Sequence, residues 1–199
     1  MFIQLITKER FHMKHTTYPL HVAGLTRDLP ICRVNDNLYI GAFVIFGDVE
    51  LTECCARDLL KLAPEHDIII TAESKGIPLA YEMAKQSGNN RYLIARKIPK
   101  LYMKNVFTVK VNSITTAKEQ TLCIDEEDAT FMKGKRVLIV DDVISTGESL
   151  YAVEQLVEKA GGNIVGKMAI LAEGDAQARP DIIYLEKLPL FHPDGTVME

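Results

Sequence analysis

One stretch of fourteen residues, 136–149, restricts the possible folds of this chain more than any other. It begins with a continuous apolar run, residues 137–140, which is typical of a strand buried on both faces of a parallel sheet. Two carboxylates, Asp141 and Asp142, stand at the end of that strand, and a small, hydroxyl-rich turn follows. A spacing of apolar residues that favours a helix begins directly after the turn. The predicted order is therefore strand, acidic pair, turn and helix.

The turn, residues 145–149, has the composition of an anion-binding site. Small residues at a helix start leave backbone N–H groups free to face a phosphate, and the helix dipole favours negative charge there. Carboxylates accept hydrogen bonds, so Asp141 and Asp142 suit neighbouring hydroxyl groups or a hydrated Mg²⁺ instead of the phosphate. The stretch therefore predicts a sugar phosphate as ligand. A plain turn with one aspartate as a helix cap is the alternative interpretation.

Length and composition narrow the possibilities further. The 199 residues, 47% hydrophobic and 25% charged, fit one globular domain spanning residues 1–199. A net charge of −4 without a lysine-rich block argues against nucleic acid or an anionic membrane as partner. No apolar run approaches membrane-spanning length, and the four cysteines lack CxxC or zinc spacing. We therefore expect a cytoplasmic protein with free thiols.

Strands alternate with helices along most of the chain, which predicts an α/β fold with a mostly parallel central sheet flanked by helices. Residues 1–48 alternate short apolar groups with turn residues and predict a small N-terminal subdomain of short strands. The alternation between residues 106 and 128 predicts a hairpin arm.

Two further loops follow predicted strands and carry polar side chains. The buried strand 68–70 leads into residues 73–76, and the strand 92–95 leads into four cations within nine residues, broken by a proline. Such a segment makes a poor helix but a good anion clamp. Taken alone, the first loop is better explained as an ordinary exposed ion pair of Glu73 and Lys75. The alternatives for the second are a solvated charged loop or a nucleic-acid patch, and the acidic bulk of the chain weakens the latter. Parallel strands present their carboxyl ends at one edge, so we expect the three loops to converge on one phosphate-rich ligand.

The 136–149 stretch closely resembles the phosphoribosyl pyrophosphate (PRPP) signature of the type I phosphoribosyltransferases. From about residue 20 to residue 191, the chain resembles the purine branch of that family, especially adenine phosphoribosyltransferase-like proteins. The resemblance implies the type I phosphoribosyltransferase fold. Residues 1–48 would then form a small hood, and residues 97–128 a flexible loop with a β-arm.

The resemblance also assigns roles to residues in the three loops. Asp141 and Asp142 would hold the ribose hydroxyls and, directly or through water, Mg²⁺. The implied PRPP-binding residues are Glu73, Ser74, Lys75, Gly76, Asp141, Asp142, Ser145, Thr146, Gly147, Glu148 and Ser149. The implied catalytic residues are Arg96, Lys97, Lys100, Asp141 and Asp142. Glu148 departs from the family pattern, which often has a second glycine there. Phe191 is a candidate for stacking on the base, although an aromatic side chain in this setting more often belongs to the core.

The function implied is transfer of the 5-phosphoribosyl group from PRPP to a purine base, which yields a nucleoside monophosphate and pyrophosphate in purine salvage. A homodimer that uses Mg²⁺ is implied as well. Adenine is the first expectation; hypoxanthine, xanthine and guanine are alternatives, because residues 1–48 carry no base-reading signature. Orotate or uracil is disfavoured by the form of the Glu73 loop. A second hypothesis is a non-catalytic PRPP-binding regulator, but residues 1–48 are short and insufficiently basic for a DNA-binding domain.

Overall fold

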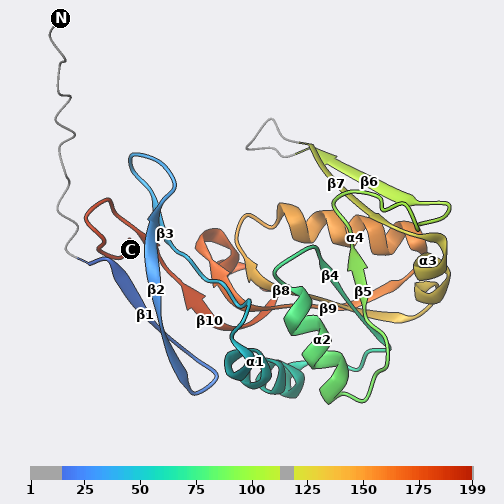
Figure 1. The fold of residues 1–199 in the computed structure, drawn as a ribbon, viewed down its shortest axis with the longest axis horizontal. Coiled ribbons are helices and arrows are strands. Elements are labelled where there is room, and N and C mark those ends of the chain that lie inside the picture. Colours follow the sequence, from blue (N-terminus) through green and yellow to red (C-terminus); the bar gives the residue numbers. More distant parts are fainter. Residues whose placement is uncertain (1–14, 113–118, 199) are drawn as a thin grey trace, which may run out of the picture.

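The computed structural model describes residues 15–112 and 119–198, and its centre is a five-stranded parallel sheet (Figure 1). In spatial order the strands are β10 (Ile183–Leu188), β9 (Asn163–Glu173), β8 (Arg136–Ile144), β4 (Ile68–Ala72) and β5 (Leu93–Ala95). The apolar runs of β4 and β8 are at most 2% exposed because helices cover both faces of the sheet. The predicted α/β class with a parallel central sheet is confirmed.

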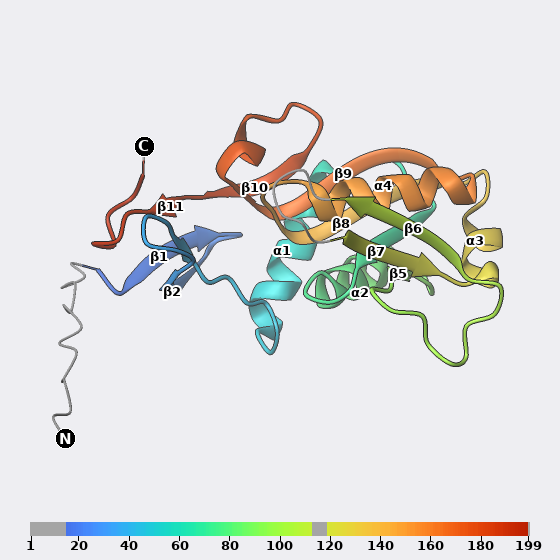
Figure 2. The ribbon, with the colours of Figure 1, turned by 90° about the horizontal axis from the view of Figure 1, so that it is seen from above.

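Helices pack on the two faces of this sheet (Figure 2). On one face lie α1 (Val49–Leu62) and α2 (Ile77–Gln86), and on the other α4 (Glu148–Ala160) and α3 (Glu126–Met132). The short 3₁₀ helix η1 (Gly174–Ala178) follows β9. The carboxylate of Asp48 starts α1 by accepting a hydrogen bond from the Leu51 amide at 3.0 Å. Gly161 ends α4 in the left-handed conformation that favours glycine.

A second, antiparallel sheet lies beside one end of the parallel sheet (Figure 1). Its strands, in spatial order, are β1 (Thr17–Val22), β2 (Leu25–Arg33), β3 (Tyr39–Gly41) and β11 (Leu190–Phe191). Three of them lie within the predicted hood of residues 1–48, of which 1–14 fall outside the described residues. The fourth comes from the other end of the chain. Arg27 on β2 joins this sheet to α1 through a hydrogen bond from Nε to Asp48 Oδ2 at 2.7 Å.

The predicted hairpin is formed by β6 (Phe107–Asn112) and β7 (Glu119–Ile124), which pair antiparallel along α4. Its expected tip, residues 113–116, lies outside the described residues. Backbone bonds in both directions between Arg96 and Cys123, each 2.8 Å long, connect β7 to the segment after β5. The flexibility expected of residues 97–128 stays a prediction, as does the division into subdomains. None of the helices in the described ranges is long and apolar enough to cross a membrane.

Candidate functional site

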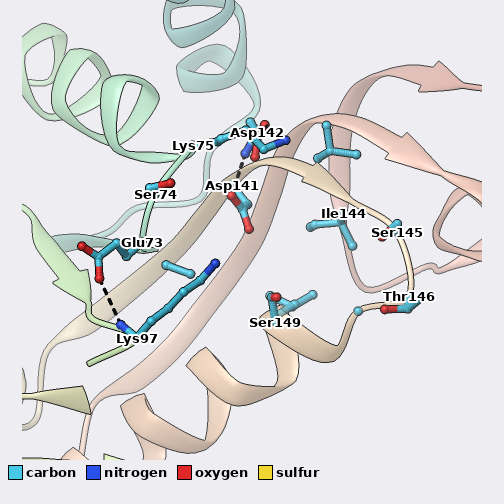
Figure 3. A pocket seen from close by; sticks show the side chains of 14 residues that line it. Glu73, Ser74, Lys75, Lys97, Asp141, Asp142, Ile144, Ser145, Thr146 and Ser149 are labelled. Atoms are coloured by element: carbon cyan, nitrogen blue, oxygen red, sulfur yellow. Dashed lines mark hydrogen bonds and ion pairs between the residues drawn. The ribbon is translucent and has the colours of Figure 1, made fainter. Parts of the chain in front are cut away.

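A cavity of about 210 Å³ opens at the carboxyl edge of the parallel sheet (Figure 3). The loops after β4, β5 and β8 contribute its walls, so the three loops singled out in the sequence do converge. The lining residues are Ala72, Glu73, Ser74, Lys75, Lys97, Asp141, Asp142, Val143, Ile144, Ser145, Thr146, Gly147, Ser149 and Leu150. The remaining predicted site residues, which lie outside this lining, are Gly76, Arg96, Lys100, Glu148 and Phe191.

The two carboxylates at the end of β8 form the floor of the cavity. Asp142 is 4% exposed, and its Oδ2 lies 3.0 Å from Lys75 Nζ. Asp141 Oδ1 accepts a hydrogen bond from the Asp142 backbone amide at 2.9 Å. Burial, and secondarily the negative charge of Asp142, raises the pKa of Asp141 well above its usual range. Asp142 is thus paired with Lys75, whereas Asp141 favours its protonated form in the ligand-free protein.

Gly76 explains how the β4 loop approaches these carboxylates so closely. A Cβ atom at Gly76 would lie 2.1 Å from Thr71 Oγ1 and 2.9 Å from Asp141 Oδ1. Any side chain there would push the loop away from β8. Gly76 thus permits the close contact between the two loops without itself lining the cavity, a role different from the direct PRPP contact that the resemblance implies.

Glu73 organises the cations that follow β5. Its Oε2 accepts a hydrogen bond from the Lys97 backbone amide at 3.1 Å, and its Oε1 accepts one from Arg96 Nη1 at 3.2 Å. Lys100 Nζ lies 3.9 Å from the same Oε1. The Lys97 hydrogen bond, with Lys100 and Arg96, lowers the pKa of Glu73, so this carboxyl is ionised at neutral pH.

The three predicted catalytic cations consequently occupy different places. The Lys97 side chain extends away from Glu73 and into the cavity, on the side where Asp141 lies (Figure 3). Arg96 instead points to Glu73 and donates from Nη2 to the Tyr102 hydroxyl at 3.3 Å. Arg96 and Lys100 thus lie against Glu73 and do not line the cavity.

The wall opposite Glu73 is the turn that starts α4. Gly147 stands at the N-cap position with φ +79°, in the left-handed region that favours glycine. Because Gly147 has no side chain, the N-cap residue itself makes no side-chain hydrogen bond to α4. The side chains of Ser145, Thr146 and Ser149 stand around this turn (Figure 3). Hydroxyl groups and helix-start amides together fit a phosphate group.

Phe191 lies away from the cavity, in the second sheet. It is 1% exposed, and its ring packs edge-on against Tyr18 with 5.3 Å between the ring centroids. A ring covered in this way has no face free for a base. The geometry therefore favours the core position that the sequence left open and gives the stacking role no support.

The side chains that could hold a metal ion are few. No group of three or more histidine, cysteine or acidic residues with metal-binding geometry occurs within residues 15–112 and 119–198. Asp141 and Asp142 offer carboxylate oxygens but not a complete cage. This donor set fits Mg²⁺, which is usually held by one or two carboxylates together with water and the phosphates of a substrate.

Sequence reasoning missed three residues at the site. Thr71 lies under Gly76, the carbonyl oxygen of Phe43 accepts a bond from Lys75 Nζ at 3.4 Å, and Arg179 packs behind Gly147. Thr71 interrupts an otherwise apolar strand, and this polar residue could have been recognised in the sequence as a candidate for the site. Phe43 contacts Lys75 and Arg179 contacts Gly147, in each case 32 residues away in the sequence, so no local pattern predicts either contact.

Comparison with known proteins agrees with this geometry. The family model described as a phosphoribosyl transferase domain matches residues 54–190. Hypoxanthine/guanine phosphoribosyltransferase of Methanococcus voltae is 33% identical over 135 residues, which cover 68% of each chain. Adenine phosphoribosyltransferase of Cenarchaeum symbiosum is 36% identical over 131 residues, or 65% of this chain and 73% of that protein.

A solved structure supports the same conclusion about the fold. Adenine phosphoribosyltransferase from Thermoanaerobacter pseudethanolicus superposes with a TM-score of 0.61 at 26% sequence identity. The superposition covers 72% of this chain and 84% of that one. The parallel sheet with its flanking helices therefore has the type I phosphoribosyltransferase fold.

We predict that the acidic floor of the cavity costs stability and serves a ligand. Asp141→Asn should raise the melting temperature of the ligand-free protein, because an amide needs neither a buried charge beside Asp142 nor the proton that Asp141 must take up on folding. The same change should weaken PRPP binding about tenfold to a hundredfold, the value of one hydrogen bond to a charged group. Thermal melts and calorimetric titrations measure the two effects.

Asp175→Asn, at an exposed aspartate of η1, is the control and should change neither the melting temperature nor PRPP binding. A lower melting temperature with unchanged PRPP affinity would show that Asp141 serves the fold instead.

Proposed function

The chain belongs to the phosphoribosyltransferase family, and on that premise we propose that it transfers the 5-phosphoribosyl group of PRPP to a purine base. The observation that carries this proposal is the arrangement of the cavity. Asp141 and Asp142, whose carboxylates suit ribose hydroxyls, share the cavity lining with the Lys97 side chain on one side and the turn that starts α4 on the other. PRPP has this order of groups: a 5′-phosphate, a ribose with free hydroxyls and a pyrophosphate.

Adenine is our first choice of acceptor base. The relatives carry names for adenine, hypoxanthine/guanine and xanthine transfer, so all four purines stand as candidates. The described cavity is lined by polar groups that fit PRPP, and its apolar wall, Val143, Ile144 and Leu150, offers no hydrogen bonds that would select among bases. The choice of adenine therefore rests on resemblance.

The proposed mechanism follows from the positions of the charges. When pyrophosphate leaves, the ribose becomes cationic and the leaving group gains negative charge. Asp141 and Asp142 would orient the ribose through its hydroxyls, and the backbone and hydroxyls of residues 145–149 would hold the 5′-phosphate. Lys97 would stabilise the departing pyrophosphate. A closed 97–128 segment would exclude water that competes with the base.

Mg²⁺ is part of the proposal. Asp141 and Asp142 would hold it directly or through water, and it would neutralise charge on the pyrophosphate. We also propose a cytoplasmic location, with which the four free cysteines are compatible.

A homodimer is proposed as well, and one surface supports it. Val44, Phe46, Val49 and Tyr81, which we call the α1–α2 patch, are 49% to 76% exposed although they are large and apolar. The patch borders a groove of about 190 Å³ between the start of α1 and the start of α2. Exposed apolar side chains grouped in this way are typical of protein interfaces.

The first prediction tests the reaction. With PRPP and Mg²⁺, at least one of adenine, hypoxanthine, xanthine and guanine should yield its nucleoside monophosphate, with adenine converted fastest. Chromatography detects the nucleotide. If PRPP binds by calorimetry but none of the four bases reacts, the regulator hypothesis replaces the enzyme.

The second prediction separates transition-state stabilisation from simple binding. Lys97→Ala should lower kcat about a hundredfold and change PRPP affinity far less, because the charge that it faces develops as pyrophosphate leaves. Steady-state kinetics and calorimetry provide the two values. Lys187→Ala, at an exposed lysine of β10 outside the cavity, should change neither. Equal losses in kcat and affinity at Lys97 would assign it to ground-state binding only.

The third prediction concerns the homodimer. Light scattering should give the parent chain twice its monomer mass, and Phe46→Glu should return it to the monomer by placing a charge in the α1–α2 patch. Leu62→Glu changes a similarly exposed residue at the other end of α1 and should leave the dimer intact. A monomeric parent would refute the dimer, and a dimeric Phe46 variant would refute this interface.

A further inference from the structure

An arginine packs against the outer side of the turn that we propose binds the 5′-phosphate. A Cβ atom built on Gly147 would lie 2.5 Å from Arg179 Nη1, so the guanidinium occupies the space where any other residue would place its side chain. Arg179 is not among the residues that line the cavity. The guanidinium therefore lies against Gly147, which lines the cavity, without lining the cavity itself.

The guanidinium is held in this position by fixed partners. Arg179 donates from Nε to Asp181 Oδ1 at 3.0 Å and from Nη2 to Asp181 Oδ2 at 2.7 Å. Lys167 on β9 donates to the same carboxylate and lies 3.0 Å from Glu154 Oε1 on α4. Two cations and two anions from three parts of the fold thus form one network. Arginine suits this position because its planar group binds a carboxylate with two parallel bonds and keeps a third nitrogen for another contact.

The placement is unusual for a cation. The N-terminal end of a helix carries partial positive charge, so an arginine beside the first turn of α4 is electrostatically unfavourable unless anions lie near it. Asp181 supplies part of that compensation. A phosphate on the inner side of Gly147 would supply more, and the guanidinium would in turn add to the positive potential that the phosphate meets.

We propose that Arg179 is a positioning residue for the phosphate turn. It fixes the left-handed backbone at Gly147 from behind and strengthens binding of the 5′-phosphate without touching it. The proposal rests on the proposed function, because it takes the ligand of this turn to be the 5′-phosphate of PRPP. It explains why residue 147 must be glycine on two grounds, the positive φ and the volume that Arg179 fills.

The first experiment compares two probes that occupy different ends of the cavity. Ribose 5-phosphate carries the 5′-phosphate, and pyrophosphate with Mg²⁺ represents the leaving group. By calorimetry, Arg179→Ala should bind ribose 5-phosphate about tenfold more weakly and pyrophosphate within about twofold of the parent. Arg179→Lys should recover only part of the loss, because lysine keeps the charge but not the paired bonds to Asp181. Lys187→Ala, which removes one exposed positive charge from β10, should bind both probes normally.

The outcomes separate this inference from the proposed function. A parent chain that binds neither ribose 5-phosphate nor PRPP would refute both. Normal ribose 5-phosphate binding by Arg179→Ala, with a parent that binds, would refute the role of Arg179 alone. Equal losses for ribose 5-phosphate and pyrophosphate would point to general damage and would also overturn the proposal.

A double-mutant cycle then tests whether Arg179 acts through Gly147. Gly147→Ala should weaken ribose 5-phosphate binding both by backbone strain and by displacing the guanidinium. In the Arg179→Ala background the second cause is gone, so the same change should cost less. Independent losses, which multiply in the double variant, would show that the two residues act separately.

Discussion

Two adjacent carboxylates at the end of a fully buried strand are the constraint on which the rest of this site depends. Charge removed from water must be compensated, and one uncompensated carboxylate can cost as much as several ordinary contacts contribute. Lys75 supplies that compensation for Asp142 from a neighbouring loop. The loop can come so close only because Gly76 has no side chain. The form of the β4 loop thus follows from the acidic pair at the end of β8.

The position of β8 in the sheet determines what surrounds these carboxylates. It lies between β9 and β4, with β5 one strand further, so the loops after β4 and β5 rise on one side of the acidic floor. The turn into α4 rises on the other. This arrangement supports the proposal that the site accommodates an anionic group at each end and hydroxyls in the middle. Lys97 would contact one anion, and backbone amides with hydroxyl groups would contact the other.

The sequence predicted the parts of this protein whose causes are local. Buried strands and the composition of the loops both depend on a few neighbouring residues, so the parallel sheet and the convergence of three loops were predictable. The fourth strand of the second sheet was not, because β11 pairs with β3 across about 150 residues of chain. Phe191 is buried by that pairing. The contact between Arg179 and Gly147 was not predictable for the same reason, because only the folded chain brings the two residues together.

The contacts of Glu73 help to decide whether this site catalyses a reaction or only binds PRPP. It holds Arg96 by a hydrogen bond and Lys100 at longer range, which keeps these cations ordered near the cavity but not within it. A partner carrying more negative charge than one carboxylate could draw them away, and pyrophosphate is such a partner, whose charge grows further as its bond breaks. Contacts exchanged in this way strengthen along the reaction, and contacts of that kind raise a rate. A regulator needs only affinity for PRPP itself, whereas an enzyme also gains from cations whose contacts strengthen as the bond breaks, so this arrangement favours the enzyme.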